Sequence, residues 1–556
     1  MPSFFSKEYI TAKASYNRWL VPPAALAIHL SIGMAYGFSV FWKPLGNALI
    51  GSDGKALAAC SAGAATFADK LHGTLRALTA TDCNWTQFDL GWMYTLFFVL
   101  LGCSAAFWGS WLERAGPRKA GLVSTFCWCG GLLLSAFGIY THQLWMMWLG
   151  SGVIGGIGLG LGYISPVSTL IKWFPDKRGM ATGMAIMGFG GGAMIGSPLA
   201  TMLMTKFSTN INGMTQPGIW QTFVVLAIIY TIFMISGSLG YRVPPTGWKP
   251  GGWNPPKNKN NNMISVNHVH LNKAHQTPQF WFLWIVLCMN VSAGIGIIGA
   301  AAPMLQETFG GALIGHSDLG FADLKKDESL LALAAAVGAG FVGLISLFNI
   351  FGRFFWASIS DKLGRKLTYI VFFTLGILMY VTASYMAGSK SLALFAACFC
   401  IIASMYGGGF ATIPAYLADM FGTQFVGAIH GRILTAWSTA GILGPVIVNY
   451  MHDMRVEAQV PFSEIYAPIF YILASMLAIG FIANLMVRPM DNKFFMTDKE
   501  LLTEKKLAHE KFISTKETIG KAEKTPLITF LAWSAVGVPI SYGIWSTIQK
   551  AWILFH

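Results

Sequence analysis

The feature that most restricts how this chain folds is a series of apolar stretches, each about 20 residues long. An α-helix of that length crosses the hydrocarbon core of a bilayer, which is about 30 Å thick. We therefore expect an all-α membrane protein. Twelve spans are predicted, at Trp19–Phe41, Leu90–Leu112, Ala120–Tyr140, Leu144–Ile171, Gly179–Met204, Trp220–Gly240, Phe280–Pro303, Leu330–Phe354, Leu367–Met386, Leu392–Leu417, Arg432–Met451 and Ile465–Val487.

The composition agrees with a protein embedded in lipid. Of the 556 residues, 54% are hydrophobic and only 11% are charged, which excludes an ordinary soluble enzyme, a disordered chain and a fibre. The net charge is +14, but the Lys and Arg residues lie in short loops and not on one soluble domain. We therefore expect the lipid bilayer as a partner and no nucleic acid.

The predicted spans fall into two groups of six. The pattern predicts an N-terminal six-helix bundle over residues 1–240, a cytoplasmic linker over 241–277 and a C-terminal six-helix bundle over 278–490. A charged segment over 491–525, expected to be a solvated helix or loop, follows. Alternate loops are rich in Lys and Arg, which places them and the N-terminus in the cytoplasm.

One more apolar run, Leu527–Ile548, follows the charged segment. It is long enough to cross a bilayer, so we expect an extra transmembrane helix within residues 526–556, with His556 outside. Pro539 lies inside the run. The alternative is therefore an interfacial hairpin that is broken at this proline.

The same loop pattern occurs in both groups of spans. An acid, a base and a glycine recur with equal spacing in residues 109–119 and 357–366, and a pair of bases follows each glycine. Equivalent positions in two halves indicate a duplicated bundle, as in many secondary transporters. Acids that pair with bases around a tight glycine turn hold neighbouring helices together. We therefore assign a gating role to Glu113, Arg114, Arg118, Asp361, Lys362 and Arg365.

These two segments resemble the signature loops of the major facilitator superfamily. Residues 89–92 (DLGW) and 172–185 (KWFPDKRGMATGMA) resemble the two signatures of monocarboxylate transporters. Residues 163–166, 406–416 and 421–432 resemble the bacterial oxalate/formate antiporter branch. The resemblance covers about residues 15–490 and implies the major facilitator fold. Residues 533–545 resemble a small single-span transporter subunit, here part of the same chain.

Arg353 is the residue on which the predicted site depends. It lies within an apolar span, and no acid stands one helical turn away on either side. A guanidinium is costly there unless it faces a watery cavity or a partner, and its planar fork matches a carboxylate. The resemblance also implies a substrate-binding arginine in this helix. The alternative is an arginine whose side chain reaches the cytoplasmic interface beside Lys362.

Other residues are expected to line the same site. Asn349 lies one turn before Arg353, where bonding between helices is the alternative, and Tyr36 lies in the first span. The resemblance implies that the hydroxyls of Tyr163 and Tyr406 meet the carboxylate, with a place in the interfacial belt as the alternative. Trp437 stands where dicarboxylate carriers of this branch have a lysine, and a single cation favours a monoanion over a dianion.

His29 lies in the middle of the first span and is a candidate for proton coupling, because imidazole changes charge near neutral pH. A structural histidine bonded to a backbone carbonyl is the alternative. We expect no cofactor and no metal site, since the linker residues His268, His270 and His275 lack cysteine partners. Whether the cysteines of the polar segment, Cys60 and Cys83, form a disulfide is left open.

The predicted function is secondary active transport of a small monocarboxylate, of the lactate, pyruvate or formate class, by alternating access. The driving force is either a co-transported proton or exchange against another carboxylate. An oxalate/formate-type carboxylate antiporter is the alternative within this class. A carboxylate sensor that no longer transports is the alternative from another class, and no arrangement of reactive groups predicts an enzyme.

Overall fold

The computed structural model describes residues 8–52, 55–62, 67–211, 214–245, 247–253, 263–265, 267–388, 391–507 and 525–551. Within them, thirteen helices are long and apolar enough to cross a membrane. They comprise α1 (Val21–Ile32) with the 3-10 helix η2 (Gly33–Phe41), α4 (Gln87–Ala115), α5 (Pro117–Tyr140), α6 (Leu144–Met147) with the π-helical η3 (Trp148–Gly155) and α7 (Gly156–Trp173), α8 (Arg178–Lys206), α9 (Ile219–Gly240), α11 (Pro278–Phe309), α13 (Glu328–Leu363), α14 (Arg365–Gly388), α15 (Leu392–Phe421), α16 (Val426–Ile433) with α17 (Thr435–Glu457), α18 (Ala467–Met486) and α20 (Pro526–Ala551).

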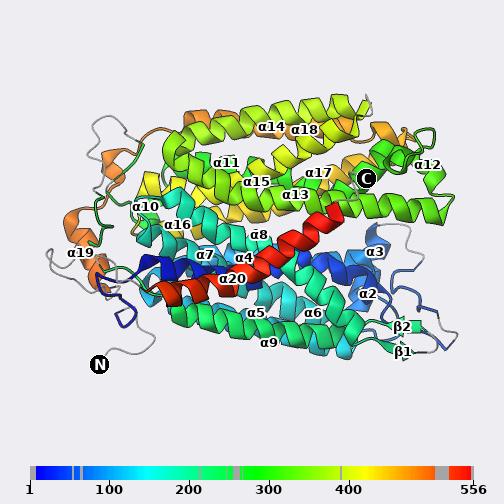
Figure 1. Ribbon diagram of the computed structural model, residues 1–556, viewed down its shortest axis with the longest axis horizontal. Coiled ribbons are helices and arrows are strands. Elements are labelled where there is room, and N and C mark those ends of the chain that lie inside the picture. Colours follow the sequence, from blue (N-terminus) through cyan, green and yellow to red (C-terminus); the bar gives the residue numbers. More distant parts are fainter. Residues whose placement is uncertain are drawn as a thin grey trace.

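The helices form two bundles that lie side by side along the long axis of the molecule (Figure 1). The N-terminal half holds α1 to α9, and the C-terminal half holds α11 to α18. The two halves meet where α8 packs against α13 and where α4 packs against α16. Two pairs of helices, one on each side, therefore form the seam between the halves.

Small residues let the backbones approach closely at this seam. A Cβ atom added to Gly109 of α4 would lie 2.7 Å from the Cα atom of Ala428 in α16. A Cβ atom added to Gly183 of α8 would lie 2.8 Å from the carbonyl oxygen of Arg353 in α13. Helices associate in lipid through close packing of small residues, because lipid tails are as apolar as the helix surfaces and the hydrophobic effect does not bring the helices together.

The repeated loops end and restart helices in the same way. Gly116 stands between α4 and α5 with φ 87°, and Gly364 stands between α13 and α14 with φ 84°. Both values lie in the left-handed region, which glycine adopts without steric penalty. The matching turns agree with the internal repeat predicted from the sequence. We call the end of the molecule that bears these two turns the basic face.

The linker and the tail also lie at the basic face, at the left of Figure 1. The linker carries α10 (Leu271–Ala274), and the tail carries η6 (Asn492–Phe494) and α19 (Asp498–Leu507). Val269 of the linker pairs with Phe495, and the amide of Met496 donates to the carbonyl of His268. The rest of the predicted charged segment, residues 508–524, lies outside the described residues.

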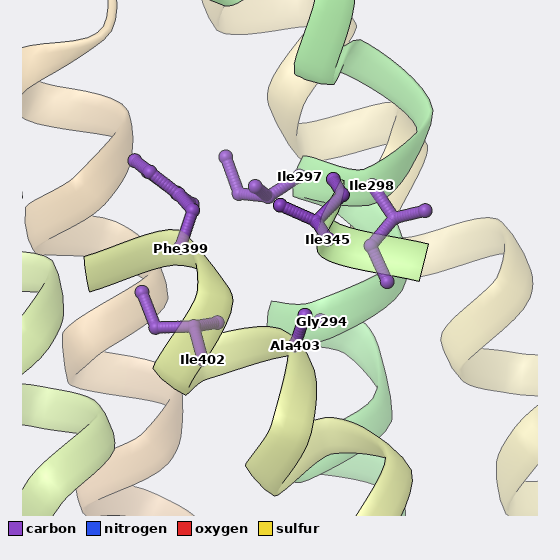
Figure 2. A pocket seen from close by; sticks show the side chains of 7 residues that line it. All are labelled: Gly294, Ile297, Ile298, Ile345, Phe399, Ile402 and Ala403. Carbon is purple, nitrogen blue, oxygen red and sulfur yellow. The ribbon is translucent and has the colours of Figure 1, made fainter. Parts of the chain in front are cut away.

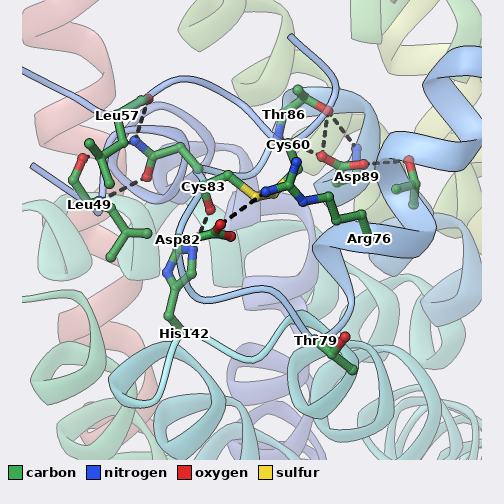
Figure 3. Close-up of a disulfide and its surroundings, with 12 residues drawn as sticks. Leu49, Leu57, Cys60, Arg76, Thr79, Asp82, Cys83, Thr86, Asp89 and His142 are labelled. Carbon is green, nitrogen blue, oxygen red and sulfur yellow. Dashed lines mark hydrogen bonds and ion pairs between the residues drawn. A yellow bond between two sulfur atoms is a disulfide. The ribbon is translucent and has the colours of Figure 1, made fainter.

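The opposite end of the molecule carries the short elements α2 (Trp42–Gly46), α3 (Phe67–Ala77), α12 (Phe321–Leu324) and the antiparallel strands β1 (Thr209–Ile211) and β2 (Met214–Gln216) (Figure 1). Cys60 and Cys83 form a disulfide there (Figure 3). The His142 ring is stacked on Trp85 at 4.3 Å between centroids, and its Nε2 donates to the Cys83 carbonyl oxygen at 2.9 Å. We call residues 55–62 and 67–86 the disulfide cap.

The thirteenth helix, α20, continues through Pro539 without a break. The interfacial hairpin considered as the alternative is therefore wrong. Figure 1 shows α20 crossing the seam diagonally, in red. It packs against α1 and α8 of the N-terminal half and against α13 of the C-terminal half. The position of His556 lies outside the described residues.

Contacts with the rest of the chain hold both ends of α20. At its start, the side-chain amide of Asn17 donates to the hydroxyls of Thr525 and Thr529, at 3.1 and 3.2 Å. Near its end, Thr547 lies beside Gly343 of α13, where an added Cβ would be 3.3 Å from the Thr547 methyl group. The start of α20 therefore contacts the N-terminal half, and its end contacts the C-terminal half.

Candidate functional site

Arg353 is buried at the seam between the two halves. It lies about 15 Å from the end of α13 at Leu363, at 1.5 Å per residue, and only 1% of its surface is exposed. Its Nε donates to Oδ1 of Asn349 at 3.1 Å, and its Nη1 donates to the carbonyl oxygen of Ile186 in α8 at 3.1 Å. The side chain therefore points across the seam and does not reach the interface beside Lys362.

The bonding pattern leaves the outer edge of the guanidinium free for an anion. Arginine has five N–H groups, and the two bonds to Asn349 and Ile186 use one on Nε and one on Nη1. Among the described residues, no carboxylate forms an ion pair with Arg353. The remaining N–H groups on Nη1 and Nη2 form the fork that binds both oxygens of a carboxylate.

Aromatic rings surround this cation. The ring centroids of Tyr36 and Phe410 lie 5.9 and 5.7 Å from the Arg353 Cζ atom, within cation–π range. Trp437 is fully buried, and its ring lies 4.6 Å from that of Phe410 and 5.6 Å from that of Tyr163. Residues of η2, α7, α13, α15 and α17 therefore meet at one place.

Two polar atoms in this shell have no hydrogen-bond partner. They are Oη of Tyr163 and Nε1 of Trp437, and both are buried. Buried polar groups are nearly always bonded, so a cluster of unbonded ones calls for an explanation such as a ligand. Tyr406 is also buried, packs against Gly294 and interacts electrostatically with Tyr36 and Arg353.

His29 lies next to this shell. Its ring is stacked on that of Tyr163 at 5.3 Å between centroids, and it is fully buried. Its Nδ1 lies 2.5 Å from the carbonyl oxygen of Ala185, and its Nε2 lies 3.1 Å from the carbonyl oxygen of Tyr163. Ala185 directly precedes Ile186, so consecutive carbonyls of α8 contact His29 and Arg353.

An ionic network joins the halves at the basic face. Glu113 of α4 accepts hydrogen bonds from Lys172 at 2.5 Å and from the backbone amide of Gly427 in the other half at 3.1 Å. Asp361 of α13 accepts from the first backbone amides of α8, those of Gly179 and Met180, at 2.8 and 2.9 Å. A carboxylate at a helix N-terminus is stabilised by the helix dipole.

Three further residues of this network, Lys172, Arg178 and Asp419, were not predicted as gating residues. Arg178 pairs with Asp419 across the seam at 2.8 Å, and Arg365 pairs with both Asp419 and Asp361 at 3.0 and 2.6 Å. Their only sequence signal is their position at span ends. We call Glu113, Lys172, Arg178, Asp361, Arg365 and Asp419 the basic-face latch.

The other three predicted gating residues lie outside the latch. Arg118 is buried within the N-terminal half, where it donates to the carbonyl oxygen of Leu239 at 2.9 Å. Arg114 is 3.7 Å from Glu504 of the tail and is mostly exposed. Lys362 is exposed. The repeat therefore identifies the right loops, but only Glu113 and Asp361 of the predicted set bond across the seam, and Arg365 pairs with Asp361 and Asp419 within the C-terminal half.

A small cavity within the C-terminal half is not a ligand site. Figure 2 shows it between α11, α13 and α15, lined by Gly294, Ile297, Ile298, Ile345, Phe399, Ile402 and Ala403. Its volume is about 10 Å³, and none of its lining side chains carries a polar atom. Such a space holds neither an anion nor a well-bonded water. Among the described residues, no group of His, Cys, Asp or Glu side chains is arranged to hold a metal ion.

Two helical halves around a buried polar centre define the architecture of a secondary transporter. The sequence pattern of the Major Facilitator Superfamily matches residues 58–445 and 331–551. The chain therefore belongs to this superfamily and is a multi-pass membrane protein of the transporter class.

Three relatives cover most of the chain. The oxalate:formate antiporter of Oxalobacter formigenes is 26% identical over 351 residues, which cover 63% of this chain and 73% of the relative. An uncharacterized MFS-type transporter of Escherichia coli, YhjX, is 24% identical over 374 residues, which cover 67% of this chain and 80% of the relative. Apicoplast pyruvate carrier 1 of Toxoplasma gondii is 25% identical over 393 residues, which cover 62% of this chain and 66% of the relative.

The fold is also that of solved transporters. The crystal structure of the transporter FucP in the outward conformation superposes with a TM-score of 0.53 and covers 84% of this chain and 99% of the FucP chain. The two sequences are 12% identical. At this identity the likeness concerns the fold alone.

Proposed function

We propose that this protein carries small monocarboxylates, of the lactate, pyruvate or formate class, across the membrane by alternating access. The observation that carries the proposal is the buried Arg353 guanidinium, which is oriented by two neutral acceptors and keeps its fork free. A fixed cation in a low-dielectric centre is a binding site for an anion. The names of the relatives, a pyruvate carrier and an oxalate:formate antiporter, support a carboxylate.

One carboxylate group suits this site better than two. Trp437 occupies the centre with a neutral ring, and both ring nitrogens of His29 face backbone carbonyls, so Arg353 is the cation with N–H groups left for an anion there. A second carboxylate would be buried without a cationic donor, which costs several kcal/mol. Asn349, Tyr36, Tyr163 and Tyr406 complete the shell around a single carboxylate and a small body.

The mechanism begins from the conformation described here, in which the basic-face latch is closed. In the proposed topology the basic face and the N-terminus are cytoplasmic, at the bacterial inner membrane, and the anion enters from the opposite side. The halves then rock about the seam, the latch separates and the site opens to the cytoplasm. Energy comes from a co-transported proton, with His29 as its candidate site, or from exchange against a second carboxylate.

Uptake into proteoliposomes tests the proposal. Purified protein is reconstituted, and counterflow of labelled formate, L-lactate, pyruvate and oxalate is measured at equal pH on both sides. We expect exchange of at least one monocarboxylate, and loss of about 100-fold or more in Arg353→Gln, as expected when a buried charged hydrogen-bond donor to the ligand is removed. Arg76→Gln, at an exposed arginine of the disulfide cap, is the matched control.

The relative from Oxalobacter formigenes favours a second candidate, an oxalate/formate-type antiporter. Oxalate exchange that exceeds pyruvate and lactate exchange would support it. Normal transport by Arg353→Gln would show that the site is assigned wrongly. Binding of these acids without any flux would identify a sensor.

A further inference from the structure

Two buried histidines lie on either side of the Tyr163 ring. His29 of α1 lies 5.3 Å from it between centroids, and His430 of α16 lies 5.8 Å from it. His29 and Tyr163 belong to the N-terminal half, whereas His430 belongs to the C-terminal half. Both histidines are fully buried, with exposures of 0% and 1%.

The geometry at His29 gives a second ring proton a place to bind. Both of its nitrogens face carbonyl oxygens, those of Ala185 and Tyr163, and carbonyl oxygens only accept hydrogen bonds. A neutral imidazole donates from one nitrogen and presents a lone pair at the other. The ring satisfies both contacts only as the imidazolium cation.

His430 shows the opposite arrangement. Neither of its ring nitrogens has a hydrogen-bond partner, although the ring is buried. Its helix, α16, begins beside the latch, because the amide of Gly427 donates to Glu113. His430 lies one helical turn, about 4.5 Å, beyond Gly427. It therefore stands between the latch and the central shell.

The charge balance connects these histidines to the anion site. Among the described residues, no carboxylate pairs with His29, His430 or Arg353; the acid-paired histidines are His270 and His452. Two cations, His29 and Arg353, would contact consecutive carbonyls of α8 and repel each other at low dielectric. A bound carboxylate removes this repulsion, so the anion and the proton favour each other's binding, as linkage requires.

The groups that face the pair from neighbouring helices are few. They are the Tyr163 phenol and Lys172 on α7, Glu113 on α4, Arg353 on α13, and Tyr406 and Asp419 on α15. Lys172 neutralises Glu113, and Arg178 and Arg365 neutralise Asp419. No free acid in this set competes for the proton.

We propose that the coupled proton binds at His29 and reaches the basic side through His430. In the closed conformation the proton stays on His29, beside the anion on Arg353. When the halves separate, the contact of α16 with α4 and α7 opens, and water reaches the two free nitrogens of His430. The proton then leaves the His29 imidazolium along this water and His430 to bulk solvent, and His29 returns to the neutral form. This inference rests on the proposed carboxylate transport.

An assay of proton-coupled uptake distinguishes a failure of this inference from a failure of the proposed carboxylate transport. Vesicles that contain the pH dye pyranine take up labelled pyruvate with and without an inward proton gradient of one pH unit. We expect the gradient to raise the wild-type rate several-fold and to acidify the interior. His430→Gln should lose this stimulation and keep pyruvate counterflow at equal pH within about twofold. His29→Gln should lose the stimulation, and His72→Gln, exposed on α3, should behave as the wild type.

Either histidine variant that keeps the stimulation overturns the inference, and so does a loss of counterflow in His430→Gln. Absence of counterflow in the wild type instead refutes the proposed transport. A second measurement needs no substrate: exchange of the imidazole C2 hydrogen, followed by mass spectrometry. We expect slow exchange at His29 and His430 relative to His72, and faster exchange at His430 in Glu113→Gln. Exchange at His430 as fast as at His72 in the unaltered protein contradicts the sealed position.

Discussion

The Arg353 guanidinium takes its orientation from an amide oxygen and a backbone carbonyl. Neutral acceptors hold the group in place without cancelling its charge, so the full charge remains for a ligand. Gly190 of α8 gives the guanidinium its room, because an added Cβ would lie 3.0 Å from Nε and 3.2 Å from Cζ. Residues without any charge thus control the position of the charge.

Gly190→Ala should therefore weaken carboxylate binding. The added methyl group displaces the guanidinium from its two acceptors, and we expect KM for the transported acid to rise about tenfold, or about 1.4 kcal/mol. Gly130→Ala is the control, since an added Cβ there meets no atom within 4 Å. Unchanged KM in Gly190→Ala would argue against the described orientation of Arg353.

Trp437→Lys tests why the site offers the substrate one cationic donor. A lysine at this buried position adds a second positive charge next to the Phe410 and Tyr163 rings, and a dianion would then neutralise both charges. We expect oxalate to compete with pyruvate more strongly in Trp437→Lys than in the wild type. Trp437→Phe, which keeps the apolar ring, should leave the preference unchanged.

At the scale of the elements, the disulfide cap shows how covalent and titratable contacts fix a segment between two spans. The disulfide joins positions 23 residues apart in the chain. Asn84 next to it bonds the backbone of Leu49 and Leu57, and Thr86 and Asp89 cap α4 (Figure 3). The cap is therefore attached to the start of α4 and to the loop that carries His142.

Removal of the disulfide should loosen the cap and spare the bundle. Closing a loop of this length stabilises by about 3 kcal/mol in the chain-entropy treatment. We expect amide hydrogen exchange in α3 of Cys60→Ser to rise accordingly, with little change in α8 and α13. Cys103→Ser, at a cysteine that forms no disulfide, should change neither.

Acid should also weaken the cap. Burial lowers the pKa of His142 below its ordinary value of 6.5, although its hydrogen bond to the Cys83 carbonyl partly opposes this. The detached cap then binds more protons than the attached one, so attachment is stable above pH 6.5 and weakens as the pH falls below it. Limited proteolysis of the cap between pH 7.5 and 5 measures this.

His142→Asn should reduce that pH dependence. His142 has a φ of 53°, and asparagine tolerates the left-handed region better than most residues. The variant therefore keeps the backbone turn and loses the titrating ring. An equal pH dependence in both proteins would assign the effect to another group.

The extent of prediction differs between elements for physical reasons. Hydropathy predicted where spans lie, because crossing lipid needs an apolar length, and the paired glycines predicted the turns at Gly116 and Gly364. The depth of Arg353 followed from its place in the span. The contacts of the Ile186 and Ala185 carbonyl oxygens with Arg353 and His29 could not be predicted, since a backbone carbonyl has no sequence signature. The pairing of Arg178 with Asp419 depends on how two halves dock, which one sequence does not encode locally.

At the scale of the whole molecule, the two halves are closed on one side. The latch and the α4–α16 contact both lie toward the basic face, and the seam at Gly109 brings its Cβ position 3.3 Å from the Cβ of Ala428. The same position lies 2.7 Å from the Cα of Ala428, closer than a Cβ atom packs against backbone, so any side chain at position 109 separates α4 from α16. Closure of the basic face therefore depends on the missing side chain of Gly109.

Gly109→Leu should therefore keep the basic face from closing. We expect carboxylate exchange to fall at least tenfold, because the cycle no longer returns to the conformation that is closed at this face. Gly130→Leu is the control, since an added Cβ there meets no atom within 4 Å. Full exchange by Gly109→Leu would show that the cycle does not need the close α4–α16 contact.

Because α20 belongs to the same polypeptide as the bundle, it reaches its groove over α1, α8 and α13 at an effective concentration that no separate helix attains in a membrane. Its occupancy is therefore independent of expression level or lipid dilution. In every copy α20 takes the place of lipid along that stretch of the seam. The bilayer therefore influences the rocking motion there only through α20.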